Sequence, residues 1–599
     1  MSDEVLRIAN VSGFYGDRFD AFAEQLTGGP VDVLTGDWLA ELTMLILYRS
    51  RAKDPSKGYA STFLHQLTGH LQQVAERGVK VVANAGGLNP AGLAAAIREA
   101  VVGAGVDLTV AHVSGDDLLP RIDELRDRHG LAHLDEGTPL AEEPMPPLTA
   151  NAYLGGWGIA EALGRGADIV VTGRVTDASV VVGPAAWRFG WARDDWDRLA
   201  GAVVAGHVIE CGAQATGGNY AFFTEVPGLE HPGFPIAEVH ADGSSVITKH
   251  EGTGGLVSVG TVTAQLLYEV GGPLYLNPDV TTDLSSVELE QVGPDRVRIS
   301  GVEGAPPTDR VKVCINTLGG FRNQATFLLT GLDVEAKAEL LERTLRRRVD
   351  LDDLDEVDVR LVRSDHPDAT TNAEAVAQLH VTVKDRDPQK VGRRAFAGPL
   401  VELALASYPG FTMTAPPADA DPFGVYWPAL VPKDEVREVV TVGEADPVEL
   451  ELTAGVDPAE LDAPELSVEW SDFEVEDATT QRVPLGTVFG ARSGDKGGNA
   501  NVGVWATSRA GFVWLARELD VPRFRELVPD ADGLEVTRTL LPNLLAVNFV
   551  VHGLLGRGVS SATRPDPQAK GLGEYLRSRL VDLPAWVLEP VPVRLDERG

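Results

Sequence analysis

Residues 79–90 read VKVVANAGGLNP, a short apolar run that ends in a glycine-rich loop and opens a helix. Asn89 and Pro90 predict the helix start, because Asn caps free N–H groups and Pro needs no N–H partner in the first turn. The helix then continues through AGLAAAIREAVVGAG, residues 91–105, and is expected to stop at glycine. This order of strand, loop and helix decides the fold.

The same order occurs five times within the first 180 residues. The loops read SGFYGD, GDWLAE, AGGLNP, SGDDLLP and GRVTDAS. Apolar runs separated by helical stretches predict parallel β/α units. The loops at the carboxyl ends of such strands gather at one edge of the sheet, where ligands bind. The five runs are Leu6–Val11, Val31–Thr35, Val79–Asn84, Leu108–Val113 and Ile169–Thr172.

The chain has 599 residues, which is too long for one ordinary core, so several domains are expected. We predict an α/β fold with a doubly wound, Rossmann-like parallel unit over about residues 1–200. A mixed α+β unit over 201–430 completes one large domain, 1–430. An acidic linker is predicted for 431–482, and a small α+β domain for 483–599.

The formal net charge is −36, which argues against nucleic acid and anionic membranes as partners. Cys211 and Cys314 are the only cysteines, so a reducing cytoplasm fits and an iron–sulfur cluster lacks its ligands. No signal peptide is expected at the amino terminus. The most apolar segments carry polar residues and are interpreted as buried elements, not membrane spans.

The loop TGRVTDAS, residues 172–179, is favoured as a catalytic site. Arg174 can clamp a carboxylate or phosphate, and Asp177 can act as a general base. Capping of the next helix by Thr176 or Asp177 explains one residue but not Arg174 as well. Asp37 in GDWLAE is a further catalytic candidate, against the alternative that an acid near a helix start suits the helix dipole.

Two glycine-rich loops are predicted to bind the phosphates or acyl oxygens of a substrate. Neither contains a dinucleotide or ATP motif, because G-x-G-x-x-G and the ending G-K-[ST] are both missing. The alternatives are a tight β/α turn for the first loop and a helix cap in a packed interior for the second. The candidates are Asn84, Gly86, Gly87 and Asn89 in NAGGLNP, and Lys249, Thr253, Gly254 and Gly255 in KHEGTGG.

The loop GARSGDKGGNAN, residues 490–501, joins two predicted strands of the small domain. A hairpin needs Gly and Asp there, but it does not need Arg and Lys as well. We therefore favour a contact with a ligand or with another domain. The candidate residues are Arg492, Ser493, Asp495, Lys496 and Asn499.

The segment HVIECGAQATGGN, residues 207–219, places His207 and Glu210 three residues apart. On a helix such a pair can share a metal, but one His, one Glu and one Cys make a thin ligand set, and a buried structural role is favoured. No metal-binding residue is assigned. The cofactor is left unknown, and a divalent metal stays open.

These motifs together resemble the AtuA family of acyclic terpene utilisation, over nearly the whole chain. The resemblance rests on NAGGLNP, TGRVTDAS, IECGAQATGG, EGTGGLVS and ARSGDKGGNANVGV. It implies a large AtuA domain followed by a small ferredoxin-like domain. It also implies a bacterial cytoplasmic protein in the catabolism of acyclic terpenoid or branched acids through acyl-CoA intermediates, alongside a biotin-dependent acyl-CoA carboxylase.

The leading hypothesis is an enzyme that acts on an acyl-CoA or a related branched acid as a hydratase or lyase. A second hypothesis is a non-catalytic partner or scaffold of the acyl-CoA carboxylase pathway. A third is a metal-dependent hydrolase that uses Asp37, Asp177, His207 and Glu210. The expected partners are the small-molecule substrate, pathway proteins and further copies of the chain in a homo-oligomer.

Overall fold

The computed structural model describes residues 5–462, 464, 466 and 479–588, without the side chains of residues 41 and 42. These residues divide into two compact units. The first unit comprises Met1–Asn316, Tyr426–Val559 and Asp566–Gly599, and the second comprises Thr317–Val425 and Ser560–Pro565. Each unit is described by itself.

A mixed sheet dominates the first unit, with 11 strands among the described residues. All five predicted runs form strands of this sheet, and each pairs in parallel with its neighbour, for example Ala9 with Leu34 and Val82 with Val170. In spatial order these strands are β1 (Val5–Asn10), β2 (Val33–Gly36), β3 (Lys80–Ala83), β6 (Ile169–Thr172) and β4 (Val110–Ser114).

Antiparallel strands extend this sheet at both edges. The sheet is therefore mixed, and the doubly wound, Rossmann-like description of this unit is not confirmed. The segment 431–482, predicted as a linker, contributes two strands to one edge, while the predicted domain boundaries stay predictions. The edge strands are β7 (Pro235–His240), β8 (Ser245–Lys249), β12 (Arg296–Ser300) and β11 (Glu288–Gly293) on one side, and β19 (Arg437–Val442) and β20 (Val448–Glu451) on the other.

Alternate side chains of the parallel strands enter two different cores, because successive side chains of a strand point to opposite faces. Ala9 and Leu34 join the core of α1 (Ala21–Thr27), α3 (Ser61–Thr68), α4 (Leu71–Arg77) and α5 (Pro90–Ala104). Ile8 and Val33 join the core of α6 (Ile122–His129), α7 (Trp157–Gly164), α8 (Ser179–Phe189), α9 (Trp196–Ile209) and α10 (Val259–Leu266). α2 (Glu41–Lys53) contributes to a separate cluster.

Helix α5 begins and ends as the sequence predicts. The side chain of Asn89 accepts a hydrogen bond from the N–H of Gly92 at 3.0 Å, and Pro90 takes the first helical position. Gly105 caps the other end with φ of +67°, in the left-handed region that glycine adopts without strain. Both ends of the helix are therefore set by residues next to it in the sequence.

Further strands complete the large part of the first unit. β9 (Leu274–Leu276), β10 (Thr281–Asp283) and β13 (Glu303–Ala305) form a small sheet. The long β14 (Arg310–Thr330) pairs with β5 (Pro147–Ala152) and β18 (Asp421–Pro432). β14 begins in the first unit and continues into the second.

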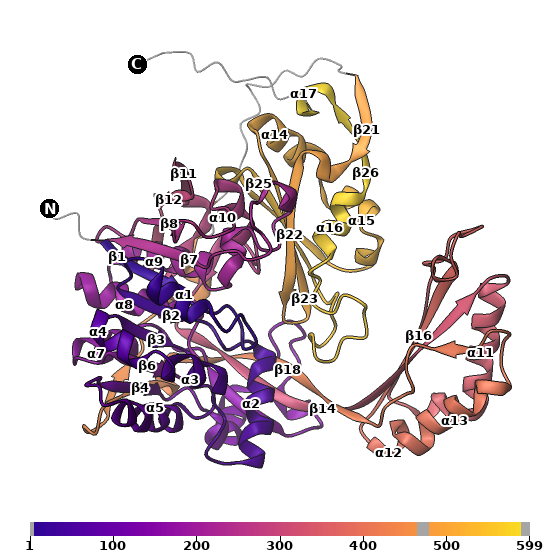
Figure 1. The fold of residues 1–599 in the computed structure, drawn as a ribbon, viewed down its shortest axis with the longest axis horizontal. Coiled ribbons are helices and arrows are strands. Elements are labelled where there is room, and N and C mark those ends of the chain that lie inside the picture. The colour runs from indigo at the N-terminus through magenta and orange to yellow at the C-terminus, as the bar shows by residue number, and fades with distance from the viewer. Residues whose placement is uncertain (1–4, 463, 465, 467–478, 589–599) are drawn as a thin grey trace. The chain divides into compact units, whose positions relative to one another are not determined.

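The carboxyl-terminal part of the first unit is an α+β layer with its own core (Figure 1). Its main sheet is antiparallel, with β22 (Phe489–Lys496), β23 (Asn499–Ala506), β25 (Ala546–Val551) and β24 (Val536–Leu541) in that order. The rings of Phe524 and Phe549 stack at 4.3 Å in this core. The remaining elements are β21 (Thr480–Pro484), α14 (Arg509–Glu518), α15 (Val521–Leu527), α16 (Leu572–Ser578), β26 (Leu580–Pro584) and α17 (Ala585–Leu588).

The second unit is an antiparallel sheet with helices against the face where Phe327 and Leu379 are buried. The amphipathic segment 332–349 forms α11 (Val334–Arg348). The other elements are β15 (Glu356–Val362), β16 (Val376–Asp385), α12 (Pro388–Val391), α13 (Gly398–Val401) and β17 (Thr412–Met413).

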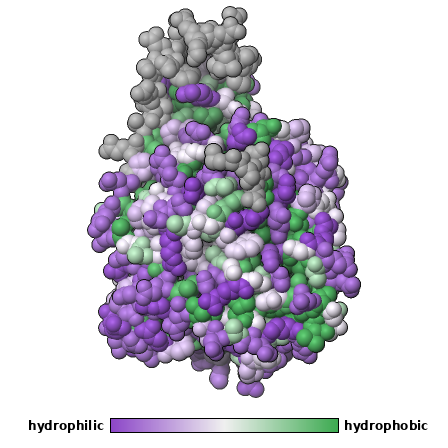
Figure 2. Space-filling view, turned by 90° about the vertical axis from the view of Figure 1, so that its left-hand side faces the viewer, coloured by the Kyte–Doolittle hydropathy of each residue, from purple (hydrophilic) through white to green (hydrophobic). Residues whose placement is uncertain are grey.

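Hydrophilic residues dominate the face drawn in Figure 2, with apolar residues scattered among them, as the acidic composition predicts. Within the described part of the chain, no helix has both the length and the apolar character needed to cross a membrane.

Candidate functional site

A cavity of about 450 Å³ in the first unit collects side chains from distant parts of the chain. They come from the loop after β6, the end of α9, the segment around β9, the start of β14 and the turn between β22 and β23. The polar lining residues are Tyr153, Arg174, Thr176, Asp177, His207, Glu210, Glu269, Tyr275, Asn277, Thr308, Arg310, Lys312, Asp495 and Lys496. Leu134, Leu274, Leu276, Val311 and Leu430 add an apolar surface.

Arg174 and Asp177 form an ion pair at this cavity. Arg174 is only 2% exposed, and its Nη1 lies 2.6 Å from Oδ1 of Asp177. The guanidinium also stacks on Tyr153, 4.3 Å from the ring centroid. Helix α8 begins at Ser179, and its cap residue Ala178 makes no side-chain cap. Asp177 therefore binds Arg174 and does not cap the helix.

The turn that carries Arg174 is shaped by a buried carboxyl group. Asp116 Oδ2 accepts hydrogen bonds from the N–H of Arg174 and from Asn151 Nδ2, both at 2.8 Å. Burial raises the pKa of Asp116 to about 7. Gly173 is required between strand and loop, because a Cβ there would lie 2.2 Å from Asp116 Oδ1.

Asp37 lies behind the cavity and does not line it. Its Oδ1 accepts hydrogen bonds from Asn84 Nδ2 at 2.5 Å and from the N–H of Leu39 at 2.8 Å. Loss of contact with water, and next the charge of Asp177, raise the pKa of Asp37 well above its ordinary value. Among the predicted catalytic residues, Arg174 and Asp177 meet in the cavity, and Asp37 interacts with both of them electrostatically.

His207 and Glu210 form a second polar pair in the cavity wall. They are 1% and 6% exposed, and His207 Nδ1 lies 3.1 Å from Glu210 Oε1. Burial, and next the charge of Lys496, lower the pKa of His207 to about 4. Burial also raises the pKa of Glu210 well above its ordinary value. Burial therefore favours the uncharged form of both groups.

The loop between β22 and β23 brings the small domain to the cavity. Lys496 Nζ donates to the carbonyl oxygen of Glu269 at 2.8 Å, and Asn499 Nδ2 donates to Asp135 Oδ1 at 2.8 Å. Arg492 binds the side-chain oxygen of Gln214. These bonds join the small domain to the large part of the first unit, and Asp495 and Lys496 also line the cavity. Ser493 instead bonds within the small domain, to Gly573 and Lys570.

Glu269 is held in an uncommon conformation where the two domains meet. Its φ is +59°, in the left-handed region, and its N–H donates to Asn501 Oδ1 at 2.8 Å. Backbone strain of this kind persists where the surroundings fix it, and it is frequent at functional sites. The small domain thus positions a cavity residue that belongs to the large domain.

Lys312, at the start of β14, is a cavity residue that no motif indicated. Its ammonium lies 5.1 Å from the ring centroid of Tyr153 and 5.4 Å from that of Tyr426. Arg174 stacks on the same ring of Tyr153. The cavity wall therefore carries two cations beside one aromatic ring, an arrangement suited to anionic oxygens.

The loop KHEGTGG does not reach this cavity. Lys249 Nζ pairs with Asp295 Oδ2 at 3.1 Å and donates to the carbonyl oxygen of Thr253. The helix that follows starts at Val259 and is capped by Ser258, so Thr253, Gly254 and Gly255 do not form its start. Gly254 is needed for close packing, since a Cβ there would lie 2.3 Å from the carbonyl oxygen of Gly228.

The loop NAGGLNP is also tightly packed. A Cβ at Gly86 would lie 2.4 Å from the carbonyl oxygen of Thr172, and one at Gly87 would lie 2.3 Å from Leu47 Cδ1. Asn89 caps α5, and Asn84 holds Asp37. None of these four predicted ligand residues lines the cavity, and their predicted role in ligand binding stays a prediction.

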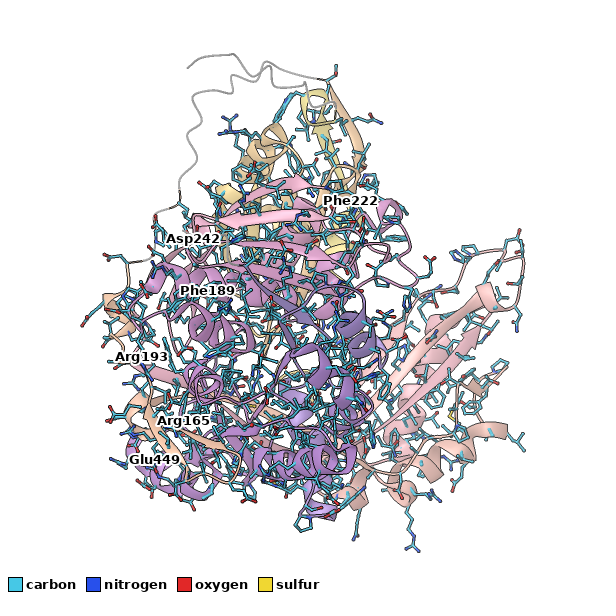
Figure 3. All side chains as sticks on the ribbon, turned by 60° about the vertical axis from the view of Figure 1, so that its left-hand side comes forward. Arg165, Phe189, Arg193, Phe222, Asp242 and Glu449 are labelled. Carbon is cyan, nitrogen blue, oxygen red and sulfur yellow. The ribbon has the colours of Figure 1, made fainter. Side chains whose placement is uncertain are left out.

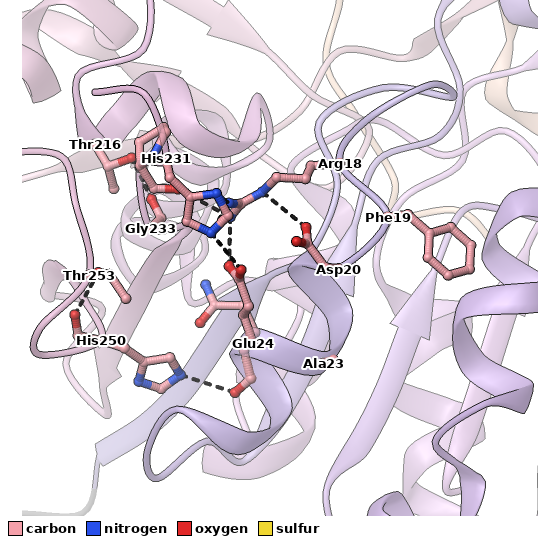
Figure 4. Close-up of polar contacts among 12 residues, drawn as sticks. Arg18, Phe19, Asp20, Ala23, Glu24, Thr216, His231, Gly233, His250 and Thr253 are labelled. Atoms are coloured by element: carbon pink, nitrogen blue, oxygen red, sulfur yellow. Dashed lines mark hydrogen bonds and ion pairs between the residues drawn. The ribbon is translucent and has the colours of Figure 1, made fainter. Parts of the chain in front are cut away.

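One cluster with the geometry of a metal site occurs elsewhere in the described part of the chain. Asp20, Glu24 and His231 place ligand atoms within 4.8 Å of one another. Arg18 lies among them, with Nη2 at 2.6 Å from Glu24 Oε2 and Nη1 bonded to the His231 ring (Figure 4). Within the described residues, the four predicted ligands of the hydrolase hypothesis do not form such a group.

Comparison with known families decides the identity of the chain. Residues 6–442 match the model described as acyclic terpene utilisation family protein AtuA. The chain belongs to the AtuA family. Residues 483–582 match the AtuA ferredoxin-like domain, as the resemblance implies. The AtuA family is implicated in acyclic terpene utilisation, which is consistent with a catabolic role. Searches of curated proteins and of solved structures found no match.

Proposed function

We propose that this AtuA protein is an enzyme that acts on an acyl-CoA or a related branched acid as a hydratase or lyase. The observation that supports this most is the cavity in which the Arg174–Asp177 pair, Lys312 and Lys496 meet next to an apolar surface. Cations beside an apolar wall suit an anionic or polarised oxygen at one end of an aliphatic chain. The volume of about 450 Å³ suits an acyl group, with the nucleotide part of a CoA thioester outside.

The roles follow from what each side chain can reach. Arg174 and Lys312 hold the carboxylate or thioester oxygen and stabilise negative charge that develops there. Asp177 lines the cavity and takes a proton from the attacking water. Asp37, fixed by Asn84, lies behind Asp177 and tunes it electrostatically. Leu274, Leu276 and Val311 pack against the aliphatic part of the substrate.

The test is a thermal-shift and turnover assay with tigloyl-CoA, a branched unsaturated thioester, and with free tiglate. A ligand at a hundred times its dissociation constant adds about 2.7 kcal/mol to the free energy of unfolding. Arg174→Met is expected to lose both this shift and turnover. Arg165→Met is the matched control, because Arg165, labelled in Figure 3, pairs with Glu161 on the surface and is not among the residues that line the cavity.

Two outcomes contradict the proposal. Full turnover by Arg174→Met overturns the assigned roles. Absence of binding and turnover with either ligand, together with stable co-purification with an acyl-CoA carboxylase, favours a scaffold in place of an enzyme.

A further inference from the structure

The His207–Glu210 pair has no part in the proton transfer assigned so far. Both residues come from the last turn of α9 and its cap, three positions apart, so one helix face presents both side chains to the cavity. Their hydrogen bond joins Nδ1 of His207 to Oε1 of Glu210 at 3.1 Å. Each side chain has a second polar atom, Nε2 in His207 and Oε2 in Glu210.

Those two atoms, His207 Nε2 and Glu210 Oε2, are buried and have no hydrogen-bond partner among the described residues. Buried polar atoms are almost always paired with protein or water, and an unpaired one costs about 1–3 kcal/mol. Both residues line the cavity, so a molecule bound there lies against this pair. Two unpaired atoms on one hydrogen-bonded pair indicate a ligand that supplies the missing partners.

Burial and two nearby acids favour the protonated form of Glu210, while the charges of Lys496 and Arg174 oppose it. Burial raises the pKa of Glu210, and the charges of Asp177 and Glu269 raise it further. With the carboxyl group protonated and Nδ1–H donating to Oε1, the proton of Glu210 sits on Oε2, the atom without a partner. The titratable and charged groups near Glu210 are Arg174, Asp177, Cys211, Glu269, Tyr275 and Lys496.

We propose that Glu210 is the general acid of the reaction and that His207 is the residue that positions it. The assignment rests on the proposed function, because addition of water to a C=C bond moves two protons and Asp177 accounts for one. Asp177 takes a proton from water as the water oxygen bonds to the β-carbon. The π electrons shift to the α-carbon, which takes the proton from Glu210 Oε2. Solvent then carries the proton from Asp177 back to Glu210, and elimination runs the same steps in reverse.

Glu210→Gln tests the acid, because the amide keeps the shape of the side chain but cannot supply this proton. The variant is expected to show the wild-type thermal shift with tigloyl-CoA and to lose about 10²–10⁴-fold in turnover. Glu161→Gln, on the exposed surface of α7, is the matched control and is expected to keep wild-type turnover. Turnover by Glu210→Gln within a few-fold of wild type overturns the assignment of Glu210 and leaves the proposed function in place.

An infrared measurement tests the same assignment without turnover. The difference spectrum of wild type minus Glu210→Gln at neutral pH is expected to contain the C=O band of a protonated carboxyl group. His207→Gln is expected to shift this band, since the hydrogen bond to Oε1 changes, and to lower kcat with little effect on KM. Absence of the band overturns the general-acid assignment. Absence of any turnover by wild type, with the band present, overturns the proposed function instead.

Discussion

Replacement of Arg174 by Met removes the charge of a buried ion pair and keeps most of the side-chain volume. At 2.6 Å, an effective dielectric constant of about 20 gives an attraction of roughly 6 kcal/mol between Arg174 and Asp177. The desolvation of both groups offsets part of this attraction, and loss of one partner of a buried pair costs about 3–5 kcal/mol. We expect a loss of this size in Arg174→Met, because Asp177 then loses the guanidinium with which it pairs and stays next to the buried Asp37.

The assay is urea unfolding followed by tryptophan fluorescence. Arg165→Met is expected to change the free energy of unfolding by less than about 1 kcal/mol, as for an exposed pair. The double variant Arg174→Met, Asp177→Asn removes the uncompensated charge and is expected to recover a large part of the loss. The reasoning is refuted if Arg174→Met is as stable as Arg165→Met, or if the double variant is no more stable than Arg174→Met.

Three further predictions concern pH, domain contact and the small core. Asp116 has a pKa of about 7 in the folded protein, so the native state keeps a proton that the unfolded chain releases above about pH 4. The free energy of unfolding is therefore expected to fall by up to about 4 kcal/mol as the pH rises through about 4–7. Asp116→Asn is expected to reduce this pH dependence, measured by urea unfolding at several pH values. Gly503→Ala places a Cβ 2.5 Å from Leu267 Cβ and is expected to cost about 1–3 kcal/mol and to lower turnover by displacing Lys496. Phe524→Ala breaks the stack with Phe549 and is expected to destabilise the small domain by about 3–5 kcal/mol, measured by hydrogen exchange.

Each of the three has an outcome that contradicts it. If the free energy of unfolding of Asp116→Asn depends on pH as strongly as that of the wild type, a buried acid other than Asp116 causes the dependence. Gly503→Ala is compared with Gly103→Ala, where a Cβ meets nothing within 4 Å, and equal stability of the two contradicts the domain contact. Wild-type protection of the small domain in Phe524→Ala contradicts the role of the stack.

The strands of the large sheet were predictable because each apolar run is bounded by turn-forming residues. The antiparallel strands at the edges of this sheet could not be predicted in this way. The pairing of β7 with β1 and of β19 with β4 joins segments more than 200 residues apart in the sequence. The cap of α5 was predictable in detail, because Asn89, Pro90 and Gly105 act locally. Local chemistry is thus readable from the sequence, while sheet order is set by long-range packing.

Some residues of the site could likewise be predicted from the sequence, and others could not. Arg174 and Asp177 stand in one loop, so the sequence alone could indicate their pairing. The glycines after Lys249 suggested an anion site, which stays a prediction, and Gly254 and Gly255 pack closely against backbone oxygens. The three-residue spacing of His207 and Glu210 indicated a pair on one helix face, but only the structure shows that each side chain has an unpaired polar atom. Tyr153 and Lys312 carry no motif, and only the course of β14 and its neighbours brings them together.

The small domain reaches the cavity through Lys496, and the side chains of Lys496 and Asn501 hold the backbone of Glu269 by two hydrogen bonds. One wall of the cavity therefore exists only while two separately packed cores stay docked. Linkage makes the effect reciprocal: a ligand that gains affinity from Lys496 strengthens the docking of the small domain by the same factor. A bound ligand is therefore expected to keep the small domain docked for a larger fraction of the time. A protease or a partner protein that contacts only the outer surface can respond to this change without touching the ligand.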